Sequence, residues 1–144
     1  MDNRAKMVNL CPVFISDDVN KTVEFYVEKL GFRYARHYDK TDNFATLYRD
    51  AIEFIIVKAN RGAVKSNSQR YGSGYDAYID PATVAGVDIL YEEFLAKGVQ
   101  IVSEPKITEY GSYEFVIEDI DGRLIGIGRV KDQETFFADS DYLD

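Results

Sequence analysis

Apolar and polar positions follow a pattern of strand, helix and three strands, and this pattern occurs twice along the chain. In the first pass, an apolar run over residues 9–15 ends at two aspartates, which is typical of a strand followed by a helix cap. Apolar residues then follow helical spacing over residues 19–30, and Gly31 ends the helix. Three further strands are predicted at residues 32–38, 44–48 and 52–57.

The second pass begins after a polar stretch, residues 59–74, whose glycines and serines make it the best candidate linker. A strand over residues 75–79 precedes a second amphipathic helix, which runs from Val84 to Leu95 and ends at Gly98. Three strands follow at residues 99–102, 113–117 and 124–127, with the hairpin signal Asp121-Gly122 between the last two. The order predicts an α+β fold of two paired βαβββ modules, whose facing sheets enclose a cleft.

Length and element order predict a single domain over residues 1–130. Within it, module one covers residues 7–58, and module two covers residues 75–130. Residues 131–144 hold one lysine and five acidic residues. We expect this acidic C-terminal tail to be disordered or to dock a partner.

The composition narrows the chemistry that the chain can perform. Of its 144 residues, 46% are hydrophobic and 29% charged, which indicates a globular protein. The chain has one histidine, His37, and one cysteine, Cys11. These are too few for an all-protein zinc site, and Cys11 has no second cysteine with which to form an internal disulfide. A nucleophilic Cys-His pair needs these two residues to meet in space, and nothing in the local sequence favours it.

The formal net charge of −8 is unevenly distributed, with +3 in residues 1–72 and −11 in residues 73–144. Nucleic acid is therefore not an expected partner, because phosphate binding needs a concentrated basic surface. A cationic ligand suits this field better than an anionic one, although surplus acid also serves solubility alone. No apolar run approaches the ~20 residues of a membrane helix. Residues 7–16 lack a small-residue cleavage site, so we expect a cytoplasmic protein with no membrane partner.

Several segments resemble the vicinal oxygen chelate superfamily, which includes glyoxalases, bleomycin resistance proteins and extradiol dioxygenases. Residues 14–32 are similar to its opening strand, acidic cap and helix, down to the ending Leu30-Gly31-Phe32, and residues 90–99 to its second helix. The family's closing pattern also occurs in order, as Glu104-Pro105, Tyr110-Gly111, Glu114-Phe115 and Asp119-Ile120-Asp121-Gly122, with Ile120 in place of the usual proline. The resemblance covers residues 7–130, and its closest type is the metal-free, bleomycin-resistance-like members.

The resemblance implies a divalent metal in the cleft, held by His, Glu or Gln from inward strand positions. Those positions correspond here to Leu10, Glu53, Tyr75 and Gly126. Only Glu53 is a strong ligand for such an ion, because leucine and glycine offer no side-chain donor and tyrosine is a poor one. We therefore predict that the chain has neither a metal nor another cofactor.

The resemblance to family members without metal ligands implies a function. The chain would be a small-molecule-binding protein that sequesters a cationic or aromatic, drug-like ligand in the cleft of a homodimer. The predicted ligand-binding residues are Leu10, Pro12, Phe14, Glu53, Tyr75 and Tyr110. The alternative is a metal-dependent lyase, isomerase or dioxygenase with an atypical site. A purely structural interpretation also stays open, in which the aromatic residues fill the module interface and Glu53 pairs with a cross-strand Tyr or Arg. The homodimer is expected because each module alone is small.

Overall fold

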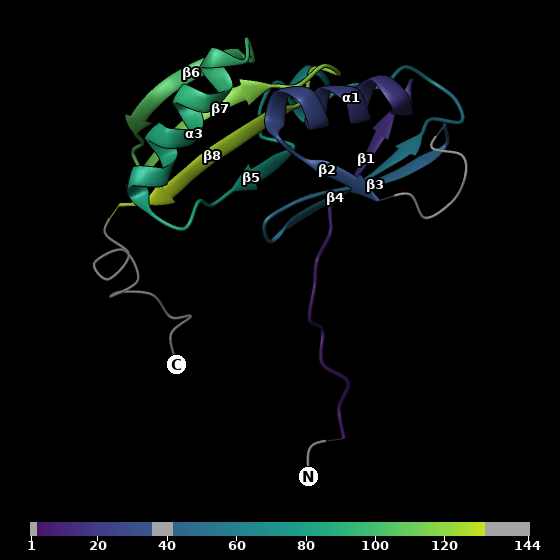
Figure 1. The fold of residues 1–144 in the computed structure, drawn as a ribbon, viewed down its shortest axis with the longest axis horizontal. Helices are drawn as coiled ribbons and strands as arrows, with labels where there is room; N and C mark the ends of the chain where they lie inside the picture. Colours follow the sequence, from purple (N-terminus) through teal and green to yellow (C-terminus); the bar gives the residue numbers. More distant parts are fainter. Residues whose placement is uncertain (1–2, 36–41, 132–144) are drawn as a thin grey trace.

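The computed structural model describes residues 3–35 and 42–131, and it contains two sheets and three helices within them (Figure 1). In chain order the elements are β1 (Val13–Ser16), α1 (Val19–Leu30), β2 (Arg33–Ala35), β3 (Phe44–Arg49), β4 (Ile52–Lys58), α2 (Asn67–Tyr71), β5 (Ala77–Ile79), α3 (Val84–Ala96), β6 (Gln100–Ile107), β7 (Ser112–Glu118) and β8 (Leu124–Val130). This order confirms the predicted α+β fold of two βαβββ modules.

The two sheets have the same topology. Sheet A has the strand order β1-β4-β3-β2, and sheet B has the order β5-β8-β7-β6. In each sheet the first strand pairs in parallel with the fourth, and the remaining neighbours are antiparallel. Figure 1 shows the modules side by side, with α1 packed on sheet A and α3 on sheet B.

Helix α1 begins and ends where the sequence predicts. The Asp18 side chain accepts a hydrogen bond from the backbone N–H of Lys21 at 3.2 Å, which caps the first turn. At the other end Gly31 adopts φ 74°, a left-handed conformation that costs glycine little. The helical spacing buries Tyr26 and Leu30 against sheet A.

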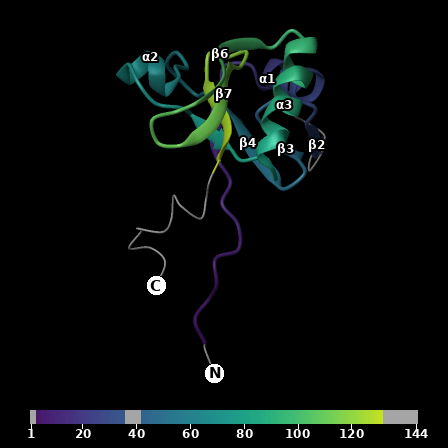
Figure 2. The ribbon, with the colours of Figure 1, turned by 90° about the vertical axis from the view of Figure 1, so that its left-hand side faces the viewer.

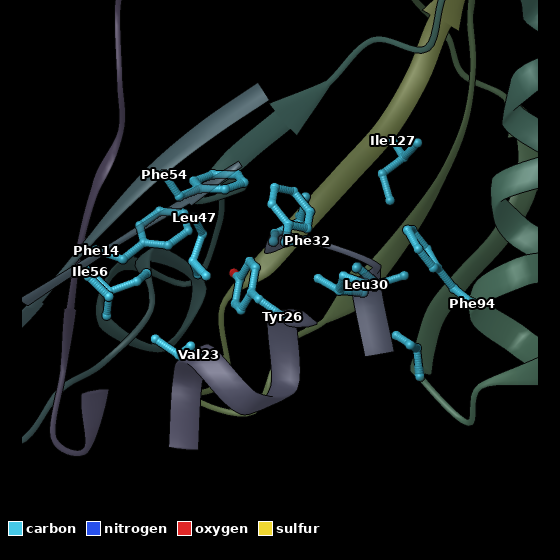
Figure 3. Close-up of a cluster of buried hydrophobic side chains, with 14 of the residues drawn as sticks. Phe14, Val23, Tyr26, Leu30, Phe32, Leu47, Phe54, Ile56, Phe94 and Ile127 are labelled. Carbon is cyan, nitrogen blue, oxygen red and sulfur yellow. The ribbon is translucent and has the colours of Figure 1, made fainter. Parts of the chain in front are cut away.

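A single hydrophobic core joins the modules. Figure 3 shows Tyr26, Phe32 and Phe54 of the first module in the same cluster as Phe94 and Ile127 of the second. The first module contributes aromatic pairs to this core, with ring centroids 5.0–5.8 Å apart. Neither module therefore completes its core alone.

Each module also sends one hairpin turn onto the helix of the other. Asp119, in the β7–β8 turn, accepts a hydrogen bond from the hydroxyl of Tyr26 at 2.7 Å and binds Arg123 at 2.9 Å. On the opposite side, Arg49 at the β3–β4 turn binds Glu93 of α3 with two contacts of 2.7 and 3.0 Å. The modules thus pair within the chain.

The first strand is shorter than predicted. It begins at Val13 rather than at residue 9, and residues 3–12 form an arm that leaves the body of the molecule (Figures 1 and 2). Pro12 has no backbone N–H to donate to a sheet, so pairing stops there after its carbonyl accepts from the N–H of Ile55 at 2.9 Å. The arm leaves Met7, Val8 and Leu10 almost fully exposed.

The polar stretch at residues 59–74 contains an element that the sequence did not predict, the one-turn helix α2. Its N-terminus is a capping box, in which the Ser66 and Gln69 side chains each bind the other's backbone N–H. Figure 2 shows α2 well apart from α1 and α3. Among the described residues, no helix is long and apolar enough to cross a membrane. His37 and residues 132–144 of the predicted tail lie outside the described part of the chain.

Candidate functional site

Each sheet has one face covered by its helix and one face turned away from it, which we call the open face. On β4, Phe54 and Ile56 are buried in the core beneath α1, so the alternate residue Glu53 lies on the open face of sheet A. On β7, Phe115 and Ile117 belong to the core. Strand alternation therefore places Glu114, Val116 and Glu118 on the open face of sheet B.

Three tyrosine hydroxyls converge on one carboxylate on this open face of sheet B. Glu114 is only 2% exposed, although it faces away from the core. Its Oε2 accepts a hydrogen bond from Tyr75 at 2.6 Å, and its Oε1 accepts from Tyr110 at 2.6 Å and from Tyr78 at 3.1 Å. We call these four residues the tyrosine cluster. Its phenols satisfy the buried carboxylate, which would otherwise be costly to bury.

Two glycines of β8 create the space for the cluster. A Cβ atom at Gly126 would lie 2.8 Å from Cδ2 of Tyr78 and 2.9 Å from Cε2 of Tyr75, closer than real side chains approach. At Gly128, a Cβ atom would lie 2.5 Å from the Tyr78 hydroxyl. Because β8 has no side chain at these two positions, the rings of Tyr75 and Tyr78 lie over the strand and stack with their centroids 6.1 Å apart.

The phenols of the cluster stay protonated at neutral pH. Burial, followed by the hydrogen bond to Glu114, raises the pKa of Tyr75 and of Tyr110. The same desolvation, together with the charge of Glu114, raises the pKa of Tyr78 to about 12. The hydroxyls therefore remain donors to the carboxylate.

The rings themselves remain available to a ligand. Tyr75, Tyr78 and Tyr110 are 37%, 41% and 53% exposed. An aromatic ring presents a negative face, and here a carboxylate lies at the hydroxyl end of all three rings. This arrangement is chemically complementary to an organic cation rather than to an anion.

The structure brings together some of the predicted ligand-binding residues and separates others. Tyr75 and Tyr110 meet at Glu114. Glu53 lies on the other sheet, where its Oε2 accepts from the side-chain amide of Asn9 at 3.3 Å, rather than from the Tyr or Arg partner considered from the sequence. Leu10 belongs to the exposed arm, and Pro12 is half-buried at the start of β1.

The prediction that Phe14 faces the cleft is wrong. Its ring is 7% exposed and stacks on Phe54, with centroids 5.0 Å apart, on the side of sheet A that α1 covers. Figure 3 shows the two rings together in the core. On β1, Val13 and Ile15 point to the open face, and the predicted ligand-binding residue Phe14 points to the core.

Sequence reasoning missed Tyr78 and Glu114 as site residues. Glu114 stands in an apolar run, Tyr113 to Ile117, as Glu53 does in its own strand. A carboxylate in such a run needs a polar partner when it is buried, and this was the available signal for Glu114. Tyr78 gave no comparable signal, because tyrosine is common in strands. Its hydroxyl also pairs with the Ser112 hydroxyl at 2.5 Å.

The residues at the positions that would hold a family metal do not fit one. Leu10 has no donor atom and lies in the arm, and the side-chain space above Gly126 is filled by tyrosine rings. The Tyr75 hydroxyl is directed at Glu114, which leaves Glu53 as the single strong donor of the set. Within residues 3–35 and 42–131, no group of three or more His, Cys, Asp or Glu side chains is placed to hold a metal ion.

Comparison with solved structures gives the same fold at low sequence identity. A glyoxalase/bleomycin resistance protein/dioxygenase from Alicyclobacillus acidocaldarius is similar with a TM-score of 0.70 and 18% identity, over 87% of this chain and 92% of that one. A lactoylglutathione lyase from Agrobacterium tumefaciens has a TM-score of 0.64 and 14% identity, over 87% and 95%. TioX from Micromonospora sp. ML1 has a TM-score of 0.62 and 18% identity, over 85% and 95%.

The family itself is established by a sequence model. Among curated proteins, none matches this chain significantly. The family model for the Glyoxalase/Bleomycin resistance protein/Dioxygenase superfamily matches residues 10–127. This range contains the core residues of both modules and the whole tyrosine cluster. The chain therefore belongs to the Glyoxalase/Bleomycin resistance protein/Dioxygenase superfamily.

Proposed function

We propose that this protein binds a small organic cation with an apolar or aromatic body at the tyrosine cluster, without a metal ion. The observation that carries the proposal is the convergence of Tyr75, Tyr78 and Tyr110 on the buried carboxylate of Glu114. A cation above these rings gains the attraction of their π faces and of the carboxylate, while an anion gains neither. Sequestration of a drug-like cation is the simplest use of such a site. The cytoplasmic location stays a prediction from the sequence.

The proposal predicts a charge-selective effect of Glu114→Gln on binding. The probes are choline and its neutral carbon isostere 3,3-dimethylbutan-1-ol, each titrated into the full chain by NMR. Glu114→Gln removes the charge but keeps an acceptor for the tyrosines, so choline affinity is expected to fall about tenfold. Affinity for the neutral alcohol is expected to change little.

The matched control is Glu118→Gln, which makes the same change on the same strand and the same open face, but away from the three rings. It should leave choline binding intact. Equal loss in both variants, or no loss in either, would overturn the proposed site. Metal analysis of the purified protein provides a separate check, because a tightly bound equimolar Ni, Zn, Mn or Fe ion would contradict the metal-free proposal and favour the lyase, isomerase or dioxygenase alternative.

We further propose that the protein is a homodimer in which the N-terminal arm packs on a second copy. The apolar side chains of Met7, Val8 and Leu10 have no packing surface within the described chain, and an extended segment offers backbone groups for pairing. Packing on an identical copy would bury these groups symmetrically. The tyrosine cluster, which is open to solvent, would gain a second wall if the partner covers it.

Light scattering at micromolar concentration is expected to give twice the 16.4 kDa of the chain. The double substitution of Val8 and Leu10 by aspartate should shift this species to a monomer, because it places charges on the packed arm. Ile89→Asp is the control, since Ile89 is also an exposed apolar residue but lies on α3. A monomer in the unmodified protein, or a dimer that survives the double substitution, would contradict this arrangement.

A further inference from the structure

A cavity lies between the two modules, on the side of the sheets that the helices cover. Its volume is about 330 Å³. Its apolar walls come from both modules and consist of Phe32, Ile52, Ile79, Leu90, Phe94 and Ile127. Figure 3 shows Phe32 on one side of this region and Phe94 and Ile127 on the other. Because these side chains belong to the core faces of the sheets, the cavity is separate from the tyrosine cluster on the open face of sheet B.

The two inter-module turns differ in length. Between β7 and β8 the turn has five residues, 119–123, whereas between β3 and β4 it has two, 50–51. The long turn sends Arg123 back between the modules, where its guanidinium lies 4.6 Å from the ring centre of Phe14 and binds the carbonyl of Ile15. Beside the short turn, Arg49 lies over the ring of Phe94 in a similar way but at a larger distance, 6.0 Å from the ring centre.

Arg49 lines the cavity and is fixed in place by hydrogen bonds. Its Nη1 binds the Leu30 carbonyl at 2.8 Å, and both its Nη atoms bind Glu93. A guanidinium with three fixed contacts keeps its position, because moving inward would break charge-assisted hydrogen bonds. Behind it, the half-buried side chains of Ile52, Ile79 and Leu90 form the accessible part of the apolar wall.

Two carboxylates and one guanidinium, that of Arg49, line the rim. Asp50 and Asp80 both line the cavity. The Asp50 side chain is 90% exposed and approaches Nε of Arg49 only at 3.8 Å, while the charge of Arg49 is already taken up by Glu93. Asp80 has no ion-pair partner in the part of the chain that the structure describes. An apolar cavity with two carboxylates at its opening complements an amphiphilic cation.

We propose that this cavity is a second binding site, which takes a small alkylammonium or arylalkylammonium ion. The apolar body lies against Ile52, Ile79 and Leu90, and the ammonium group lies at the rim near Asp50 and Asp80. A volume of about 330 Å³ is at the small end of ligand pockets, which limits the occupant to a compact amphiphile. A neutral amphiphile gains the same apolar burial without the attraction of the carboxylates, and an anionic one is repelled by them.

The test uses hexylammonium, hexan-1-ol and hexanoate as probes, titrated into the full chain and followed by the NMR methyl signals of Ile79, Leu90 and Ile127. Hexylammonium is expected to bind about tenfold more tightly than hexan-1-ol, and hexanoate more weakly than both. The double variant Asp50→Asn with Asp80→Asn should remove the difference between the ammonium ion and the alcohol. Both side chains are exposed, and asparagine tolerates the left-handed backbone of Asp50, φ 52°, so this variant should fold.

Two further variants locate the site. Leu90→Phe fills the cavity and should weaken the alcohol and the ammonium ion alike, whereas Glu114→Gln should leave the titration of the Ile79, Leu90 and Ile127 methyl signals unchanged for both probes. Equal affinity of the two probes in the unmodified protein would overturn the proposal, as would a lack of any methyl shift at millimolar probe. Loss of the hexylammonium-induced shifts of these methyl signals in Glu114→Gln would instead assign them to the tyrosine cluster and also overturn this second site.

Discussion

Replacing Phe14 with alanine is expected to lower the free energy of unfolding by about 3–5 kcal/mol. The ring is buried, stacks on Phe54 at 5.0 Å and supports the guanidinium of Arg123 at 4.6 Å. Removing it leaves a cavity in the shared core and an arginine without its aromatic platform. Urea unfolding at an unchanged m-value measures the loss.

Val13→Ala is the matched control, because Val13 is the preceding residue of the same strand and points to the open face. It should cost less than about 1 kcal/mol. The pair of variants tests the correction to the predicted orientation of β1 directly. If Phe14 faced the cleft instead, Phe14→Ala would weaken choline binding and leave stability almost unchanged.

Asp119→Asn is expected to destabilise the protein by about 3 kcal/mol. The Asp119 side chain is fully buried, and its two oxygens accept from the Tyr26 hydroxyl, from Arg123 and from the backbone N–H groups of residues 121 and 123. An asparagine keeps one acceptor oxygen but turns an NH₂ group towards donors. Of the two carboxylates that Arg123 binds, only the partly exposed Asp121 then remains. Breaking one partner of a buried ion pair typically costs this much.

The control for Asp119→Asn is Asp50→Asn in the corresponding turn of the first module. The Asp50 side chain is exposed, so its loss of charge should change stability by less than about 0.5 kcal/mol. Urea unfolding of both variants measures the contrast. Similar small effects at both turns would mean that the buried network of Asp119 does not hold the modules together.

The order of the elements could be predicted from the sequence because periodicity and caps are local. Helix α1 has the predicted bounds, since the cap residue Asp18 and Gly31 act within a few residues. The length and facing of β1 could not be predicted in this way. The apolar run over residues 9–15 does not show where pairing with β4 begins, and a shift of one residue reverses every side chain.

The candidate site was predicted only in part, for a related reason. Tyr75 and Tyr110 are conspicuous aromatic residues, but they meet only because β8 lies between β5 and β7 in the sheet. The position of Glu114 opposite Gly128 is a fact of strand register, and nothing local to either residue specifies it. The cavity between the modules is lined by residues of both modules that are far apart in sequence, so only the structure reveals it.

The contacts made by the β7–β8 turn also bear on how the chain folds. Thr22 binds Asp121 and Tyr26 binds Asp119, across sequence separations of 99 and 93 residues. Contacts of such high sequence separation close large loops and slow the search for the native state. During synthesis, the buried hydroxyl of Tyr26 has no acceptor from this turn until the last hairpin has emerged from the ribosome. We therefore expect the first half of the chain to reach its final packing only once the second half is complete.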